Sequence, residues 1–211
     1  MTNKQIESII KFHQLTCKLK TTIRSGWKYW KVNENRIESV AEHVFGCAML
    51  AVGIFSTAKI DVDIEKVITM LALHETEEVL IGDITMFDSK KMKTKKQDGR
   101  KAVLTLFKDF ENSDKFLALI EEFEQNQTLD AHFANQIDKL EADLQAEYYS
   151  NSVDYDKVSS LIMSNPEMIK LKEQGCKTLG EYFLQSDKHK FSGECLEIAE
   201  YLEKNKIKKL K

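Results

Sequence analysis

The scarcity of helix-breaking residues constrains the fold of this chain more than any other feature. Its 211 residues contain a single proline, Pro166, and eight glycines. Proline removes a backbone donor and clashes inside a helix, while a sheet with many strands needs tight turns that glycine and proline supply. The sequence therefore predicts an all-α fold, a single-domain helical bundle.

Apolar residues at three- and four-residue spacing mark where the longest helices should lie. Ser39-Val40-Ala41-Glu42 has the form of a capping box directly before the apolar run Val44–Ile54, which places His43 in the first turn of a mostly buried helix. Gly82 is a natural terminator for a helix that begins near Asp61. The expected helical segments are 6–17, 40–54, 61–82, 102–126 and 130–150.

Two segments of the first half are expected to be loops. The first is the aromatic alternation from Trp27 to Val32, and the second is the lysine-rich segment from Lys90 to Lys101, predicted to be mobile. Residues 155–211 are expected to form two or three more helices around Pro166 and Gly193. We expect residues 1–152 to form a core and residues 153–211 to be accessory helices of the same domain.

Composition excludes several classes of protein. The chain is 42% hydrophobic, and its 31 basic and 34 acidic side chains give a net charge of −3, with the two signs interleaved. This balance does not indicate nucleic-acid binding, and the lysine clusters at 90–101 and 204–211 are expected to be solvated surface. Neither a signal peptide nor a membrane span of about 20 apolar residues is evident, so we expect a cytoplasmic protein.

The cysteines do not form a recognisable zinc-finger or disulfide pattern. Cys17, Cys47, Cys176 and Cys195 are far apart, without a Cys-x-x-Cys pair. Cys47 lies within an apolar helical pattern and is expected to be a small buried thiol. Reduced thiols fit the expected cytoplasmic location.

Four potential metal ligands lie in segments that are predicted to be helical: His43, His74, Glu75 and Asp138. Burying an unpaired charge is costly, so the pair His74-Glu75 inside an apolar stretch needs a partner, and a metal would provide one. Each residue alone has a simpler explanation. His43 could be a core histidine, His74-Glu75 a buried ion pair, and Asp138 a solvated helix residue.

Three segments together resemble the HD-domain metal-dependent phosphohydrolases, and in particular their 5'-deoxynucleotidase branch. The resemblance covers about residues 8–150 and includes Arg24-Ser25-Gly26-Trp27. The segments that carry it are Glu38-Ser39-Val40-Ala41-Glu42-His43, Ala72-Leu73-His74-Glu75-Thr76-Glu77-Glu78-Val79-Leu80-Ile81-Gly82-Asp83-Ile84 and Gln136-Ile137-Asp138-Lys139-Leu140-Glu141. This family is helical, which agrees with the predicted bundle.

The resemblance implies one divalent transition metal, Mn, Co, Ni, Fe or Zn, held by His43, His74, Glu75 and Asp138. It also implies that Glu78 transfers a proton to the leaving 5'-oxygen and that Asp83 is a catalytic carboxylate on the substrate side. The remaining implied contacts are substrate-binding: Arg24 or Arg36 would hold the phosphate and Trp27 would stack on base or sugar. One position departs from the family pattern, because Glu75 stands where the family has aspartate.

The activity implied is that of a 5'-nucleotidase, which releases phosphate from nucleoside or deoxynucleoside 5'-monophosphates, in a homodimer. Two alternatives stay open. An HD hydrolase could act on another phosphorylated substrate, such as a nucleoside triphosphate or a cyclic nucleotide. A metal-stabilised helical module without catalytic activity would use the same ligands for structure alone.

Overall fold

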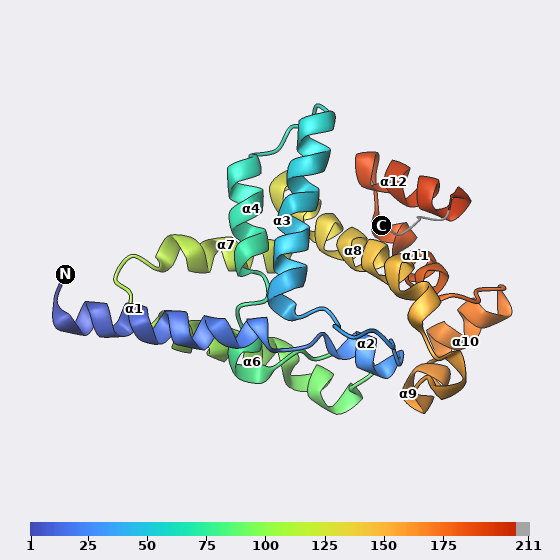
Figure 1. The fold of residues 1–211 in the computed structure, drawn as a ribbon. Coiled ribbons are helices and arrows are strands. Elements are labelled where there is room, and N and C mark those ends of the chain that lie inside the picture. The colour runs from blue at the N-terminus through green and yellow to red at the C-terminus, as the bar shows by residue number, and fades with distance from the viewer. Residues whose placement is uncertain (206–211) are drawn as a thin grey trace.

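The computed structural model describes residues 1–205 and is built of helices (Figure 1), which confirms the all-α prediction. Within these residues the extended pairing is limited to two isolated bridges, Ile23 with Ser39 and Val32 with Val153. The α-helices are α1 (Asn3–Thr16), α2 (Ser25–Tyr29), α3 (Val40–Thr57), α4 (Ile64–Leu73), α5 (Glu78–Ile81), α6 (Ser89–Phe107), α7 (Asp114–Gln125), α8 (Leu129–Tyr149), α9 (Ser160–Met163), α10 (Pro166–Glu173), α11 (Leu179–Asp187) and α12 (Gly193–Lys204). Four short 3₁₀ helices are Cys17–Lys20, Ser150–Ser152, Tyr155–Lys157 and Lys188–Lys190.

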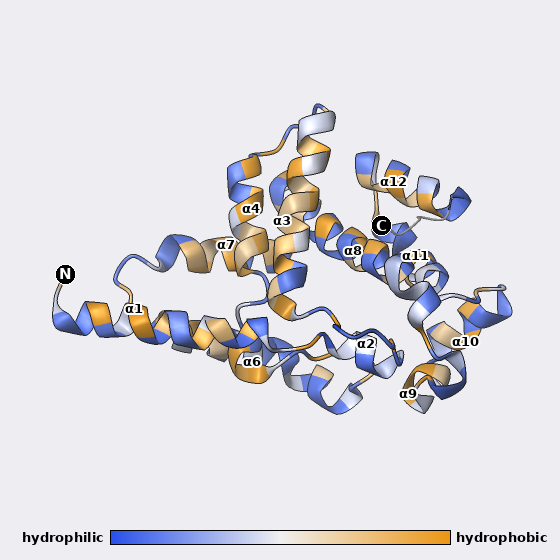
Figure 2. Ribbon diagram, viewed as in Figure 1, coloured by the Kyte–Doolittle hydropathy of each residue, from blue (hydrophilic) through white to orange (hydrophobic). Residues whose placement is uncertain are grey.

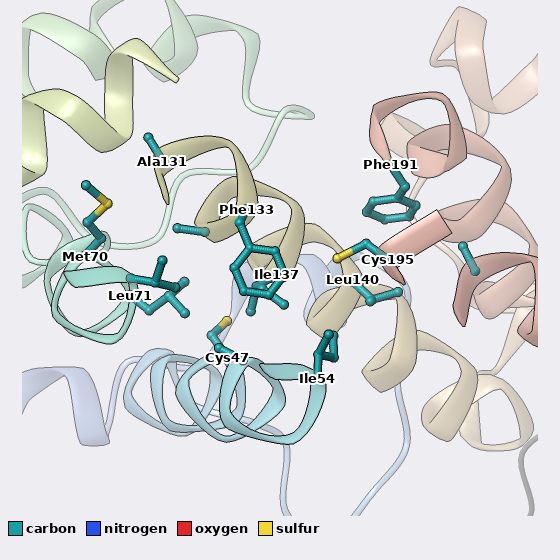
Figure 3. Close-up of a cluster of buried hydrophobic side chains, with 14 of the residues drawn as sticks. Cys47, Ile54, Met70, Leu71, Ala131, Phe133, Ile137, Leu140, Phe191 and Cys195 are labelled. Carbon is teal, nitrogen blue, oxygen red and sulfur yellow. The ribbon is translucent and has the colours of Figure 1, made fainter. Parts of the chain in front are cut away.

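The central core is formed where α3, α4 and α8 pack against one another (Figure 3). The predicted capping box of α3 is confirmed, because the Ser39 hydroxyl accepts from the Glu42 amide and the Glu42 carboxylate accepts from the Ser39 amide. The predicted helix at 130–150 is also confirmed as α8. Core side chains from all three helices meet in Figure 3, among them Cys47, Leu71 and Ile137.

The C-terminal helices pack on the core through α11, which lies along α8. A second hydrophobic cluster joins Trp27 and Trp30 of the N-terminal half to Leu179 and Tyr182 of α11. Between residues 155 and 205 the structure has four α-helices, so the expected two or three were too few. The division at residue 152 stays a prediction.

The expected mobile loop at Lys90–Lys101 is wrong, because these residues belong to α6. The Asp88 side chain caps this helix by accepting a hydrogen bond from the Lys91 amide at 3.1 Å. Lysine is a good helix former, and a run of lysines can stay helical where one face still reaches the core. The first turns of α6 are mainly hydrophilic in Figure 2, as expected for solvated surface.

The second lysine cluster, at 204–211, was also expected to be solvated surface. Lys204 is exposed, and the other lysines of that cluster lie outside the described residues.

Three other boundaries differ from expectation. Trp27–Val32 is not simply a loop, because α2 continues through Tyr29. The predicted helix 102–126 is divided by residues 108–113 into the end of α6 and α7. The predicted helix 61–82 breaks after Leu73, and a turn at 74–77 leads into the short α5. Gly82 does end this segment, with φ of 74°.

The length and composition of α3 would also suit a membrane span, since its 18 residues have a mean hydropathy of 1.5. No membrane span was expected from the sequence. In the structure one side of α3 packs on α4 and α8. A core helix that is apolar around most of its circumference has the same length and hydropathy as a membrane span. Figure 2 shows the apolar character of α3 beside these neighbours.

A buried carboxyl group on α8 makes a testable contribution to stability. Asp143 is 2% exposed, and neither carboxylate oxygen has a hydrogen-bond partner within residues 1–205. Burial, reinforced by nearby Asp187, raises the pKa of Asp143 well above its ordinary value. The folded state therefore binds the proton more tightly than the unfolded state, and this group's stabilising contribution is lost as pH rises above the unfolded pKa.

We predict that Asp143→Asn stabilises the protein at pH 8 by about 1–3 kcal/mol, because asparagine, unlike aspartate, takes up no proton on folding, and each unit by which the folded pKa is raised corresponds to about 1.4 kcal/mol. The difference from wild type should shrink as pH falls toward the ordinary pKa of aspartate. Urea unfolding of both proteins at pH 5 and pH 8 measures it. An Asn variant that is less stable than wild type at pH 8 would contradict the prediction.

Candidate metal centre

Three of the predicted ligands come together although they lie on different elements. His43 is in the first turn of α3, His74 is the C-cap of α4, and Asp138 is in the middle of α8. The Asp138 Oδ1 atom lies 3.0 Å from His43 Nε2 and 3.6 Å from His74 Nε2. All three side chains are buried. The packing of α3, α4 and α8 that forms the core thus also assembles this cluster.

The ring of His74 has one nitrogen engaged and one open. Its Nδ1 donates to the Leu71 carbonyl at 2.7 Å, which leaves Nε2 as the unprotonated nitrogen. Nε2 is buried and has no hydrogen-bond partner among the residues that the structure describes. A buried polar atom without a partner is costly. A divalent metal at Nε2, shared with His43 and Asp138, would satisfy it, so the residues present fit such an ion.

His43 is oriented in a similar way by a side chain. Its Nδ1 donates to Glu141 Oε2 at 2.5 Å, and its Nε2 faces Asp138. The Cys47 sulfur lies 3.7 Å and 3.6 Å from the two ring nitrogens, so it packs beside the ring and not along the lone pair of Nε2. Burial raises the pKa of Cys47 to about 12, which keeps it a neutral thiol, and the prediction of a small buried thiol is confirmed.

Glu75 lies beside the cluster and is held by an arginine. The ligand atoms of His43, Cys47, His74 and Asp138 all lie within 4.8 Å of one another, whereas Glu75 Oε1 is 3.8 Å from His74 Nε2 and accepts from Arg24 Nη1 at 2.9 Å. Burial would raise the pKa of Glu75, but His74 and Arg24 outweigh burial and lower it to about 2. Glu75 is therefore ionised, and its carboxylate is paired with the Arg24 guanidinium.

A cavity of about 440 Å³ opens next to the cluster. Its wall contains both catalytic candidates, Glu78 and Asp83, together with Arg24. Residues of the C-terminal helices also line the cavity, so it is formed by both halves of the chain. Other lining residues include Trp27, Glu75, Lys95, Asp138, Lys139, Glu167, Phe183, Ser186, Asp187 and Lys190.

Glu78 is the most unusual carboxyl group of the cavity. It is 2% exposed, and neither oxygen has a hydrogen-bond partner within the described chain, although Lys95 Nζ lies 3.7 Å from Oε1. Burial, with the neighbouring charges of Glu75 and Asp83, raises the pKa of Glu78 to about 10. The group is thus a carboxylic acid at neutral pH and can donate a proton.

Asp83 and Trp27 shape the cavity on the side of α2. The Asp83 carboxylate accepts from the Ser25 amide, and its carbonyl accepts from the Ser25 hydroxyl at 3.1 Å, which fixes the start of α2. Trp27 is 2% exposed, stacks on Phe183 with ring centroids 5.3 Å apart, and donates to Glu38. Trp27 also lines the cavity, and its stacking on base or sugar stays a prediction.

The structure does not bring Arg36 to the cavity, and its substrate-binding role stays a prediction. Its side chain is 82% exposed and pairs with Glu42 at the surface. Arg36 precedes the Ser39 cap in a polar loop, and nothing in that loop turns the long side chain inward. Arg24, in contrast, is at the cavity wall as predicted.

Three charged residues near the cluster were not predicted from the sequence. Lys139 Nζ lies 2.7 Å from Asp138 Oδ2, and Lys95 reaches the cavity from a helix that was expected to be a loop. Glu141 follows Asp138 by three residues, which places both on one helical face and could have been noticed. No sequence pattern distinguishes Lys95, because it lies within a run of surface lysines.

Comparisons with known proteins agree with this geometry. The model of the HD-domain family matches residues 16–174. The 5'-deoxynucleotidase HDDC2 of Xenopus laevis is 30% identical over 145 residues, 68% of this chain and 70% of the relative. The Bos taurus protein of the same name is 25% identical over 181 residues, 81% of this chain and 85% of the relative. A predicted metal-dependent phosphohydrolase from Magnetospirillum magnetotacticum shares the fold, with a TM-score of 0.66, 24% identity, and coverage of 95% of this chain and 94% of that chain.

Proposed function

The chain belongs to the HD-domain family, and on that basis we propose that it is a metal-dependent phosphohydrolase that releases phosphate from nucleoside and deoxynucleoside 5'-monophosphates. The observation that carries the proposal is the open Nε2 of His74, buried beside His43 and Asp138 at the edge of the cavity. The relatives named 5'-deoxynucleotidase support the choice of substrate.

The metal would be held by His43, His74 and Asp138, with Glu75 as the fourth predicted ligand. Two imidazoles and carboxylate oxygens suit Mn, Fe, Co, Ni or Zn. When bound, such an ion lowers the pKa of a coordinated water and polarises a phosphoryl oxygen. Burial alone would raise the pKa of Asp138, but the Lys139 ammonium group and the two histidines together outweigh burial and hold the pKa well below its ordinary value, so Asp138 stays ionised.

The cavity residues supply the remaining chemistry. Arg24, anchored by Glu75, provides a cationic fork at the wall where a phosphate would bind, and Lys95 and Lys139 add positive charge. Glu78 holds a proton at its carboxyl group and is placed to give it to the leaving 5'-oxygen. Asp83 organises the start of α2 and so positions Arg24 and Trp27.

The proposal is tested by measuring phosphate release from a panel of nucleoside and deoxynucleoside 5'-monophosphates. Metal-stripped protein is resupplied with manganese, cobalt, nickel, iron or zinc. We expect turnover that depends on the metal. Release only from triphosphates or cyclic nucleotides would favour another HD hydrolase, and stoichiometric metal binding without any turnover would favour a non-catalytic module.

Substitution of Glu75 tests the departure from the family pattern. Glu75→Asp restores the His-Asp pair and is expected to keep phosphate release, with a changed preference among the metals. Glu75→Gln removes the negative charge and should raise the metal dissociation constant about 10-fold or more. Titration of each variant with metal and chelator measures this. A Gln variant that binds metal as wild type does would leave Glu75 as the partner of Arg24 alone.

We also propose that the protein is a cytoplasmic homodimer. Phe45 and Met49 lie one turn apart on α3 and are 67% and 51% exposed, which supports an apolar contact between copies. The four free cysteines are compatible with a reducing compartment. Light scattering of the purified protein tests the dimer, and a monomer at micromolar concentration would contradict it.

A further inference from the structure

We propose that Glu141 is a positioning residue that orients the imidazole of His43, and that Gly46 is present in α3 because Glu141 needs its space. The inference rests on the metal centre of the proposed function. Glu141 Oε2 accepts from His43 Nδ1 at 2.5 Å, and Glu141 itself is 9% exposed. An acceptor at Nδ1 fixes both the tautomer and the rotation of the ring, which leaves the lone pair of Nε2 directed toward His74 and Asp138.

The contact between Gly46 and Glu141 explains a glycine that the helix alone does not favour. Glycine in a helix interior is unfavourable, yet Gly46 lies in the first half of the 18-residue α3. A Cβ atom at this position would overlap Glu141 Oε1 and would lie 3.0 Å from its Cδ and 3.2 Å from its Cγ. The carboxyl group thus reaches His43 by passing directly over the bare backbone of α3.

A second acidic side chain borders Glu141 on the side of α2. Ligand atoms of Glu38, His43 and Glu141 lie within 4.8 Å of one another. Glu38 is itself fixed, because its carboxylate accepts from Trp27 Nε1 at 2.7 Å and its amide donates to the Tyr149 hydroxyl at 3.0 Å. The Glu141 carboxylate therefore lies between α3 and the fixed carboxylate of Glu38.

The two histidines of the centre differ in a way that makes the inference testable. The Leu71 carbonyl holds His74, and a backbone atom cannot be removed by substitution. A side chain holds His43, so its removal frees one ring while the other stays fixed. Partners of this kind typically change metal affinity by about 10- to 100-fold.

The first experiment measures cobalt binding by competition with a chelator and records the visible spectrum of the cobalt-loaded protein. Glu141→Ala should weaken cobalt binding about 10- to 100-fold and alter the spectrum, while Glu141→Gln, which keeps an acceptor oxygen, should stay within a few-fold of wild type. Asp143→Ala is the matched control, since it removes another buried carboxyl group from the same helix. It should bind cobalt as wild type does.

The second experiment compares two glycines of α3. Gly53 has no atom within 4 Å of its Cβ position among the described residues, so Gly53→Ala should leave cobalt affinity unchanged. Gly46→Ala should weaken cobalt binding and lower the melting temperature. In Gly46→Ala/Glu141→Ala the clash is gone, so the melting temperature should recover while cobalt affinity stays as weak as in Glu141→Ala.

The outcomes separate this inference from the proposed function. Wild-type protein that binds no cobalt would defeat both. If wild type binds cobalt and Glu141→Ala binds it equally well, the positioning role is wrong. The positioning role is also wrong if Glu141→Gln or Asp143→Ala binds cobalt as weakly as Glu141→Ala does. It is wrong as well if Gly46→Ala has the same cobalt affinity and melting temperature as Gly53→Ala.

Discussion

Replacing Asp138 with alanine is expected to remove the bound metal and to lower kcat/KM for nucleoside monophosphates at least 1,000-fold, about 4 kcal/mol of transition-state stabilisation. The reason is its central position, because Asp138 Oδ1 contacts both His43 and His74. Without this carboxylate the two imidazoles and Glu75 remain, and the charge of Glu75 is already paired with Arg24. A divalent cation would then meet a site without its nearest anion.

Elemental analysis and phosphate release measure the two effects on the same preparation. His43→Ala should behave in the same way, and the double variant should bind no more metal than either single variant, because the ligands act as a unit. Asp143→Ala serves as the control, since it removes a buried carboxyl group from α8 outside the cluster. Full metal content in the double variant would show that the ligand assignment is wrong.

The helices that could be predicted from the sequence are those with local signals. The capping box Ser39–Glu42 and the apolar spacing of α8 are patterns within a single stretch of sequence, and both are confirmed. The breaks were harder to predict. The chain leaves α4 at His74, where a 3.0 Å hydrogen bond from the Thr76 amide to the Leu73 carbonyl closes a turn, and an apolar period continues across that turn. Periodicity alone therefore predicted one helix in place of two.

The lysine-rich segment failed for a different reason. Its first half carries few apolar residues, and a dense run of lysines is typical of a solvated loop. The helix forms because its later turns, from Ala102 to Phe107, pack on the core cluster with Phe12, and helix formation propagates back to the Asp88 cap. This contact joins residues that are nearly 100 positions apart, so no local pattern contains it.

The candidate site, too, depends on contacts between distant residues that no local pattern contains. The residues of the metal cluster were found because a family resemblance linked three distant motifs, not because any one motif required it. Arg36 was expected near the phosphate but lies at the surface, since the order of residues does not determine the direction of a long side chain in a loop. Lys95 and the C-terminal wall of the cavity were missed because only tertiary packing brings them to the site.

Glu78→Gln is expected to lower kcat for nucleoside monophosphates about 100-fold or more, with metal content and KM nearly unchanged. The pKa of about 10 means that Glu78 keeps its proton at neutral pH, and glutamine reproduces that neutral shape without a transferable proton. Since the folded pKa lies above the ordinary value, the acid form is lost only as pH rises toward 10. Wild-type kcat should therefore fall on the alkaline side in a step that the Gln variant lacks.

An aryl phosphate separates proton donation from other roles of Glu78. Its phenolate leaving group departs without a proton, so a variant that lacks the general acid should lose far less activity on this substrate than on a nucleotide. Glu77→Gln is a suitable control, because Glu77 is the adjacent carboxyl group, its pKa is also raised by burial, to about 7, and it packs against Gly99 of α6. Equal losses on both substrates, or loss of metal from Glu78→Gln, would assign Glu78 to the metal and not to the leaving group.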